Sequence, residues 1–460
     1  TTRPSHPYSL LPIRTGPLGS RLLATSAVRL TTPGPAFFYG GLAGKRNILG
    51  IRIQSFVSMG ITTILWFVCG YSLCFSGDTM GGLIGNLDKV FMHGVDLNSP
   101  FPGNHKLPEF VFMAYQMMFA IITPALITGA FVNRVTFKAY LLFLVLWQLL
   151  VYYPFAHMVW GGGLLARMGV LDFAGGIVVH ATAGFAALAS VFYVGHRRDK
   201  ASPPNSVPLI AIGTGLLWFG WYGFNAGSEL DVNAITGLAF LNTDVAASFA
   251  AIVWLAIEWT VQRRPKFVGL LTGAVAGLAT ITPAAGFVSL PSAALIGMAA
   301  GVVCYLAVHL KNKLGWDDAL DVWGVHGIGG ALGVVLLGVF ASKAVNAGGA
   351  DGLLAGGSHF FIIQCAAVLG ASLYAFLFTR VMPGVINVFT RGRTSNADGD
   401  RGLAGPPRGG DVDRGVAGAK GPAGRGTSRA GSGRSRWSAT WRFSAGRRRS
   451  DAKPVTWVGR

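Results

Sequence analysis

The sequence predicts an all-α polytopic membrane protein with eleven transmembrane helices, arranged as a five-plus-five inverted repeat plus a final helix. The first observation is composition, because 52% of the 460 residues are hydrophobic, only 12% are charged and 65 are glycine. Such a chain cannot hide its apolar surface in a water-soluble core, and small residues allow close helix packing in lipid. The second observation is a series of long apolar runs, and the third is the concentration of basic residues in alternate loops.

Ten apolar runs reach the roughly twenty residues that a helix needs to span the hydrocarbon core of a bilayer. They lie at about 54–75, 110–133, 137–160, 170–195, 207–227, 236–261, 268–287, 289–310, 324–342 and 357–382. An eleventh, at about 22–43, is interrupted by Arg29 and Pro33. Gly and Pro also break several other runs, for example at Thr282-Pro283. In lipid such breaks survive only where the backbone is buried in protein or faces a water-filled cavity, which favours a transport path over simple anchors.

The basic residues in the short loops predict the orientation of the helices. Loops 1/2, 3/4, 5/6, 7/8 and 9/10 hold thirteen Lys or Arg residues, whereas the alternate loops hold only Lys89, Lys106, Arg167 and Lys343. Basic loops stay preferentially in the cytoplasm. We therefore expect a multi-pass protein of the plasma or inner cell membrane, with the N-terminus outside and the C-terminus cytoplasmic.

The formal net charge of +19 belongs mainly to the two ends of the chain. Residues 391–460 hold sixteen Lys or Arg against five Asp, and residues 1–36 hold four Arg and no acidic residue. A nucleic-acid partner is therefore not predicted. We expect an irregular N-terminal segment at 1–34 with an indistinct start of helix 1, a membrane domain at 35–390, and a disordered Gly/Arg-rich tail at 391–460.

Ionisable residues inside the predicted spans are the candidates for function, because burying them in a membrane is costly. These residues are His157, His180 and Glu258, with Asp172, Asp321 and His326 nearer the ends of their spans. His180 and His326 close the first and second blocks of five helices. In an inverted repeat the site lies near the midplane where the blocks meet. The two histidines therefore face each other, or each is a neutral imidazole bonded to a backbone carbonyl.

Several motifs resemble those of the ammonium transporter family, in family order and over about residues 35 to 390. They are Phe37–Leu42, Ala156–Leu165, Asp172–Gly176, Trp221–Ser228, Thr282-Pro283 and Asp321–Gly327. The resemblance implies an outer cation site at Phe119, Trp160 and Ser228, a gate at Phe119 and Phe224, and paired pore histidines at His180 and His326. It also implies that Asp172 supports the outer site without contacting the substrate.

These residue types suit a small cation that must shed its water. A ring face attracts a cation by roughly 0.5 to 2 kcal/mol, and a serine oxygen accepts a hydrogen bond from ammonium. Below the gate an unpaired charge would face an apolar lumen, and the free energy of removing it from water exceeds what the contacts of this site provide. Deprotonation removes the cost, and two neutral imidazoles offer ammonia both a donor and an acceptor. The expected function is therefore transport of ammonium or ammonia, without enzyme activity, cofactor or metal.

The resemblance further implies a homotrimer in the lipid bilayer, and a PII-type signal protein that docks at the cytoplasmic face. The Gly/Arg-rich tail replaces the family's acidic tail, so we expect that regulation to be weakened or absent. An alternative function is an ammonium sensor that signals to a cytoplasmic partner. A third is an intramembrane metal hydrolase built on His157, His180 and His326, which lacks a carboxylate at ligand spacing.

Overall fold

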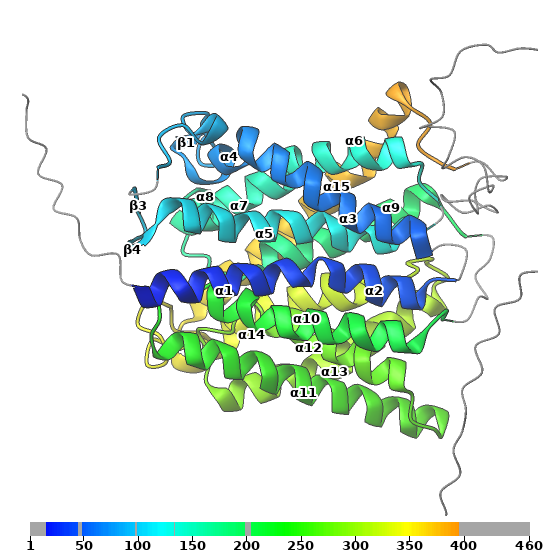
Figure 1. Cartoon of the computed structure of the whole chain (residues 1–460). Coiled ribbons are helices and arrows are strands. Elements are labelled where there is room, and N and C mark those ends of the chain that lie inside the picture. Colours follow the sequence, from blue (N-terminus) through cyan, green and yellow to red (C-terminus); the bar gives the residue numbers. More distant parts are fainter. Residues whose placement is uncertain (1–14, 45–47, 97–98, 133, 198–203, 395–460) are drawn as a thin grey trace, which may run out of the picture. The chain divides into compact units, whose positions relative to one another are not determined.

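The computed structural model describes residues 15–44, 48–96, 99–132, 134–197 and 204–394. The expected disordered tail therefore lies outside the described residues, apart from 391–394. The described chain is a bundle of helices that run side by side, with the short strands gathered at one end (Figure 1). The strands form two antiparallel pairs, β1 (Asp78–Thr79) with β2 (Ile84–Gly85) and β3 (Pro100–Phe101) with β4 (Asn104–Pro108).

The first five crossings are built from helices that in four cases change type along their length. In chain order they are α1 (Thr15–Thr31) with α2 (Pro33–Leu42); α3 (Ile48–Leu65), η2 (Trp66–Gly70) and α4 (Tyr71–Phe75); α5 (Glu109–Ile127) with η4 (Thr128–Ala130); α6 (Phe137–Trp147), η5 (Gln148–Tyr152) and α7 (Tyr153–Trp160); and η6 (Gly176–Ala181) with α9 (Thr182–Val194). The segments η2, η5 and η6 are π-helical, and such bulges are frequent at functional sites.

The next six crossings are more regular. They are α10 (Val207–Gly227), α11 (Ala234–Gln262), α12 (Phe267–Ile281), α13 (Leu290–Lys313), the π-helical η7 (Trp323–Gly327) with α14 (Ile328–Phe340), and α15 (Ser358–Phe389). The connections contain η3 (Val90–Met92), α8 (Leu164–Arg167) and η8 (Leu353–Ala355). Within the described residues, nine helices are long and apolar enough to cross a membrane, and Phe267–Ile281 is a shorter apolar helix. The eleventh crossing is formed by α1 and α2, which are separated by the break at Thr32, so the helical membrane fold with eleven crossings is confirmed.

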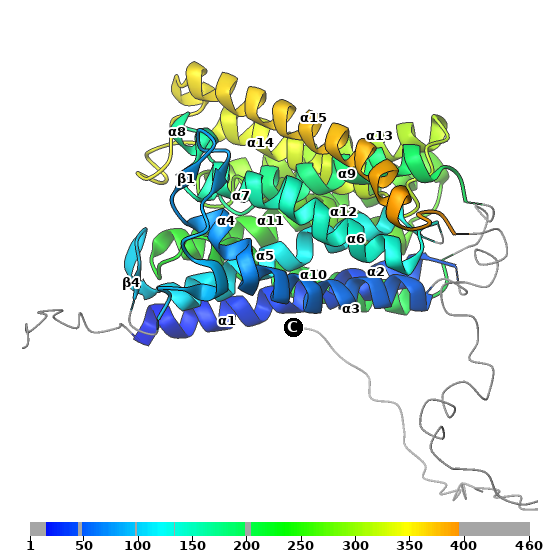
Figure 2. The ribbon, with the colours of Figure 1, turned by 90° about the horizontal axis from the view of Figure 1, so that it is seen from above.

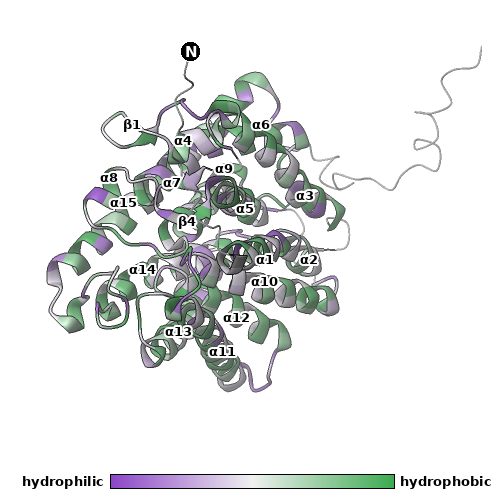
Figure 3. Cartoon of the chain, turned by 60° about the vertical axis from the view of Figure 1, so that its left-hand side comes forward, coloured by the Kyte–Doolittle hydropathy of each residue, from purple (hydrophilic) through white to green (hydrophobic). Residues whose placement is uncertain are grey.

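The first crossing differs from the span predicted at 22–43. Its helix begins at Thr15, so much of the segment expected to be irregular is helical, and it breaks at Thr32. Pro33 then occupies the first turn of α2, where its missing N–H leaves no helical hydrogen bond unmade. Seen from above, α1 and α15 lie on opposite sides of the bundle (Figure 2). The helices are mainly hydrophobic, and hydrophilic colour is more frequent in the loops (Figure 3).

The loops that are rich in Lys and Arg meet at one end of the bundle, which we call the inner end. Arg134 donates to the carbonyl oxygen of Gly195, and Arg197 pairs with Asp317 at 2.8 Å. Thr136 donates to the carbonyl oxygen of Arg391 at 2.7 Å, which ties the end of the described chain to the same loops. The alternation predicted from charge is therefore present in the fold.

The alternate loops meet at the opposite end, which we call the outer end. Asn104 donates to the carbonyl oxygen of Leu230 at 2.8 Å, and Asn346 donates to that of Gly286 at 2.9 Å. Strands β1 to β4 lie in the loop between the second and third crossings. The names outer and inner follow the orientation that the charge distribution predicts.

The two blocks of helices approach each other closely where two glycines meet. A Cβ atom placed on Gly184 of α9 would lie 2.1 Å from the backbone of Gly327 in η7. A Cβ on Gly330 of α14 would lie 2.6 Å from the Cβ of His180. Because backbone cannot yield as a flexible side chain does, only glycine allows η6 and α9 to pack against η7 and α14 at this distance.

Replacing Gly184 with Ala is expected to lower the free energy of unfolding by about 1 to 3 kcal/mol, because the added methyl group overpacks this contact. The matched control is Gly215→Ala in α10, where a Cβ would meet no atom within 4 Å. The control is expected to be neutral or slightly stabilising. The measurement is the midpoint of thermal unfolding in detergent, followed by tryptophan fluorescence. Equal midpoints for Gly184→Ala and the wild type would contradict this account of the crossing.

Candidate functional site

A cavity of about 240 Å³ opens at the outer end of the bundle, and it contains three of the predicted residues. Phe119 of α5, Trp160 at the end of α7 and Ser228 at the end of α10 all line it. Phe101, Phe112 and Phe173 add further aromatic rings, while Gln116 is the one amide. The cavity has room for several water-sized molecules. It therefore combines ring faces with a few polar groups, as a site for a small cation requires.

Trp160 is held at the mouth of the cavity by the chain that follows it. Its Nε1–H donates to the carbonyl oxygen of Asp172 at 2.8 Å, and its ring meets Phe119 edge-on with centroids 5.6 Å apart. Gly162 reverses the chain with φ of +81°, a conformation that favours glycine. The Gly-rich run after Trp160 thus ends helix α7 and turns the chain back toward Asp172, which holds the Trp160 indole.

Ser228 lies where helix α10 ends, and its hydroxyl donates to the carbonyl oxygen of Phe224 at 2.9 Å. The phenolic oxygen of Tyr115 lies 3.3 Å from the same hydroxyl and 2.8 Å from that carbonyl oxygen. When the serine proton is committed to Phe224, its lone pairs remain free to accept. Our sequence analysis missed Tyr115, although it lies one helical turn before Phe119, which places both residues on one face of α5.

Phe119 and Phe224 close the inner side of the cavity. Their ring centroids are 4.3 Å apart at 33°, and the two side chains are 1% and 2% exposed. The rings leave the outer cavity on one side. On the other, the ring centroid of His180 lies 6.0 Å from that of Phe224. The two phenylalanines therefore stand between the cavity and the histidines.

His180 and His326 come together from the two halves of the chain. Their rings are stacked with centroids 5.3 Å apart at 23°, and both side chains are buried. His180 also stacks on Trp221 at 5.3 Å. Within the described residues, neither ring nitrogen of His180 has a hydrogen-bond partner, so this imidazole is not simply bonded to a backbone carbonyl. The arrangement in which the histidines face each other is the one present.

A narrow void of about 10 Å³ continues the path on the inner side of His326. It is lined by His326 together with Tyr39, Leu126 and Val325. Such a volume is close to the minimum for one water molecule. Cavity, phenylalanine pair, histidine pair and void follow one another from the outer end inward.

Asp172 organises the start of η6, which carries His180. Its two carboxylate oxygens accept four backbone hydrogen bonds, from Gly175, Gly176, Ile177 and Val178, at 2.6 to 3.2 Å. These are the N–H groups that the first turn of a helix leaves without partners. Asp172 does not line the outer cavity, but its own carbonyl oxygen holds the indole of Trp160.

Asp318 has the matching position in the second half of the chain. Its Oδ2 accepts from the backbone N–H of Trp323 at 2.7 Å, at the start of η7, and the side chain is buried. Asp172 precedes His180, and Asp318 precedes His326, by the same eight residues in the sequence. That equal spacing was the signal our sequence analysis missed when it selected Asp321. Asp321 instead pairs with Lys311 at 2.6 Å.

His157 and Glu258 lie apart from this path. Both ring nitrogens of His157 are engaged, by the carbonyl oxygen of Cys74 at 2.9 Å and by Asp78 at 2.6 Å, which ties α7 to the loop after α4. Glu258 lies against Gly269 at the start of α12. Within the described residues no three His, Cys, Asp or Glu side chains converge as metal ligands. The three histidines of the hydrolase hypothesis do not form one cluster.

Eleven membrane crossings around a buried path that contains two facing histidines define a multi-pass membrane transport protein. A profile of the Ammonium Transporter Family matches residues 21–403, and the chain belongs to that family. It is 42% identical over 380 residues to an ammonium transporter of Bacillus subtilis, covering 82% of this chain and 93% of the relative.

Solved structures agree with this assignment. The crystal structure of Saccharomyces cerevisiae Mep2 is similar with a TM-score of 0.79 and 35% identity, covering 84% of this chain and 88% of that one. A structure titled Sensor Amt Protein is similar with a TM-score of 0.76 and 30% identity, covering 84% of this chain and 96% of that one.

Proposed function

We propose that this protein carries ammonium across the membrane by capturing the cation in the outer cavity, releasing its proton and passing ammonia between His180 and His326. The observation that supports this most directly is the order of groups along one path. A cavity lined by aromatic rings is followed by a closed pair of phenylalanines and then by two facing histidines. Family membership supplies the substrate.

The outer cavity suits ammonium better than a metal cation. Phe119 and Trp160 offer ring surfaces, which attract any cation, but Ser228 offers an acceptor, which favours a cation that donates hydrogen bonds. Asp172 supports this site from behind, through the carbonyl oxygen that fixes the Trp160 indole. Its carboxylate is fully occupied by backbone N–H groups and so does not bind the substrate.

The path beyond Phe119 and Phe224 suits a neutral molecule. Both rings are almost fully buried, and the void below His326 is lined mainly by apolar side chains. An ammonium ion there would lose its hydration without gaining a counter-charge. Breaking one N–H bond gives ammonia, which proceeds inward, and a proton, which a water molecule of the outer cavity accepts and which then crosses separately by way of the histidine pair. One positive charge therefore crosses for each ammonia, and the free ring nitrogens of His180 offer hydrogen-bonding partners to both.

The second candidate function is an ammonium sensor, and the similarity to the structure titled Sensor Amt Protein supports it. A sensor built on this fold would bind ammonium in the same cavity without sustained flux. The two candidates therefore differ in the current that ammonium drives through the protein in liposomes.

Replacing Trp160 with Leu is expected to raise the KM for ammonium by about 2- to 30-fold, because the loss of one cation–π contact corresponds to roughly 0.5 to 2 kcal/mol. The readout is the concentration dependence of the ammonium-induced current on solid-supported membranes. The matched control is Trp259→Leu, since Trp259 is an exposed residue of α11 and does not line the cavity. A wild-type KM in the Trp160 variant would argue against capture at this site.

The double variant His180→Ala, His326→Ala is expected to lose selective, proton-coupled ammonium uptake while it stays folded. The two rings are the titratable groups that face each other across the repeat, and removing them lets water fill the space. Ammonium and potassium currents should be measured together, because an unselective leak is an expected consequence. The control is His309→Ala in α13, where the histidine is exposed. Wild-type selective current from the double variant would refute the role of the pair.

We also infer that the protein is a homotrimer and that docking of a PII-type signal protein at the inner end is weakened. Several helices expose long apolar faces, such as those of α11 and α15 with Ile252, Leu369 and Leu373, and small residues allow close helix contact. Native mass spectrometry in mild detergent, with a PII-type protein added, is expected to show three chains and no nucleotide-dependent addition. Monomers alone would contradict the homotrimer. A stable, nucleotide-dependent complex with the PII-type protein would contradict the weakened docking.

A further inference from the structure

The turn between α10 and α11 carries part of the outer cavity in an unfavourable backbone conformation. Ser228 and Leu230 both line the cavity, and Leu230 has φ of +57°. This left-handed region is rarely adopted by residues with a branched or bulky side chain, and it persists where surrounding contacts determine it. The position of Ser228 therefore depends on whatever holds this turn in place.

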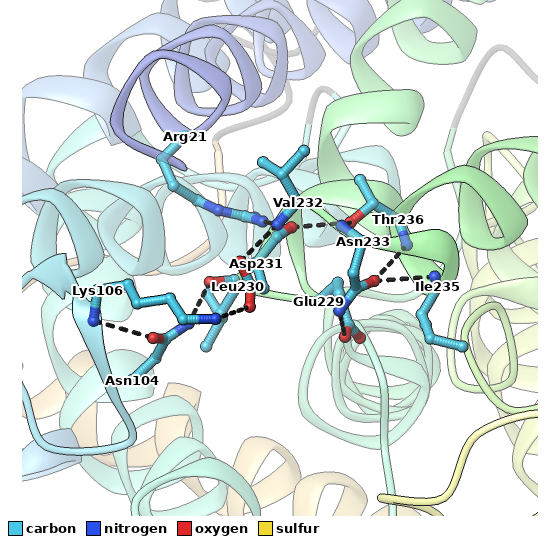
Figure 4. A network of polar contacts seen from close by, with 10 residues as sticks. All are labelled: Arg21, Asn104, Lys106, Glu229, Leu230, Asp231, Val232, Asn233, Ile235 and Thr236. Carbon is cyan, nitrogen blue, oxygen red and sulfur yellow. Dashed lines mark hydrogen bonds and ion pairs between the residues drawn. The ribbon is translucent and has the colours of Figure 1, made fainter. Parts of the chain in front are cut away.

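Side chains from two other elements hold the turn by its backbone carbonyls (Figure 4). Asn104 of β4 donates to the carbonyl oxygen of Leu230 at 2.8 Å, and Arg21 of α1 donates through Nη2 to that of Asp231 at 2.7 Å. Lys106 of β4 also pairs with the Asp231 carboxylate at 3.0 Å. Arg21 is the one of these three that comes from a membrane-crossing helix, and it is 1% exposed.

Arg21 reaches the outer site by a second route, through Tyr115. The guanidinium carbon lies 5.9 Å from the centroid of the Tyr115 ring, and the phenolic oxygen of Tyr115 lies 3.3 Å from the hydroxyl of Ser228. One buried side chain thus contacts both the turn that carries Ser228 and the residue that lies against the Ser228 hydroxyl.

Acidic residues accompany Arg21 beside the cation site. These are Glu229 and Asp231, and Lys106 is the second basic residue of the group. Burial raises the pKa of Glu229, although its bond from Asn233 and the charge of Arg21 oppose the rise. The hydrogen bond from Lys106 lowers the pKa of Asp231. Two cations thus accompany two carboxyl groups.

We propose that Arg21 is a positioning residue of the outer ammonium site, which holds Ser228 in place through the carbonyl oxygen of Asp231 and through the ring of Tyr115. The inference rests on the proposed function, because it assigns Arg21 a role only if Ser228 contacts the substrate. It extends that function to helix α1, which lines no part of the outer cavity.

The test compares Arg21→Met, which removes charge and donors, with Arg21→Lys, which keeps the charge but not the planar fork. The Met variant is expected to raise the KM for ammonium about tenfold with a maximal current within about twofold of wild type, since a hydrogen bond from a charged donor is lost. The KM of the Lys variant is expected to lie between those of the wild type and the Met variant. The matched control is Arg29→Met, which removes an exposed charge two turns along the same helix and should leave KM unchanged.

The direction of the change separates positioning from simple electrostatics. If Arg21 acted only as a cation that repels ammonium, Arg21→Met would lower KM, and that result would overturn the inference. An unchanged KM in Arg21→Met would overturn it as well. If the Met variant does not accumulate as folded protein, the Lys variant decides, and a wild-type KM there has the same consequence.

A double-mutant cycle with Ser228→Ala separates this inference from the proposed function. If Arg21 acts through Ser228, Arg21→Met raises KM far less in the Ser228→Ala background than in the wild type. A Ser228→Ala variant with wild-type KM would show that the proposed outer site itself is wrong. If Ser228→Ala raises KM and the Arg21→Met effect simply adds to it, only the role of Arg21 is refuted.

Discussion

The structure depends on the need to satisfy backbone N–H groups where helices begin inside the membrane domain. A helix that starts in the hydrophobic region exposes four donors, and lipid offers them no acceptor. Asp172 accepts four of these hydrogen bonds at the start of η6, and Asp318 accepts one from Trp323 at the start of η7. Because the π-helical turns that carry His180 and His326 follow directly, the carboxylates fix where those turns begin.

The two histidines then meet because the backbones behind them are allowed to touch. A Cβ on Gly184 would clash with the backbone of Gly327, and a Cβ on Gly330 would clash with the Cβ of His180, so these glycines let α9 and α14 pack closely against η7 and η6. The two buried carboxylates and the glycines thus act together to bring His180 and His326 face to face. This places two buried imidazoles, one from each half of the chain, in a stacked arrangement with ring centroids 5.3 Å apart.

Hydration changes in one direction along that path, and this gives the proposed chemistry its order. The outer cavity offers a hydroxyl, an amide and ring faces, whereas Phe119 and Phe224 close it with side chains that are almost fully buried. In the proposed function a cation is therefore stabilised before the rings and destabilised after them. The proposed loss of a proton belongs at the boundary between these two environments, where the charged form would stop being the more stable one.

Local patterns in the sequence predicted most of the fold. Each of the ten clear apolar runs coincides with a helix, since hydrophobicity over about twenty residues is a property of neighbours along the chain. The predicted cavity, ring and histidine positions also come together, although their roles await the experiments above. Asp318 was missed because the motif around His326 drew attention to Asp321, and only the equal spacing to the two histidines distinguishes them. Long-range contacts were beyond such patterns, and Arg21 meets Asp231 across 210 residues.

Arg21 shows most clearly why a departure from an apolar pattern has to be interpreted in three dimensions. In the sequence it lies immediately before the span predicted at 22–43, and an arginine in a membrane helix is costly. In the fold it lies at the outer end of α1, where Tyr115 offers a ring face and Asp231 offers a carbonyl oxygen. Nε and Nη1 still have no partner within the described residues. A residue kept only for stability would be better replaced there by a well-packed apolar side chain. The geometry therefore favours a role at the neighbouring site, because the contacts that Arg21 does make all lead to the turn and the tyrosine beside Ser228.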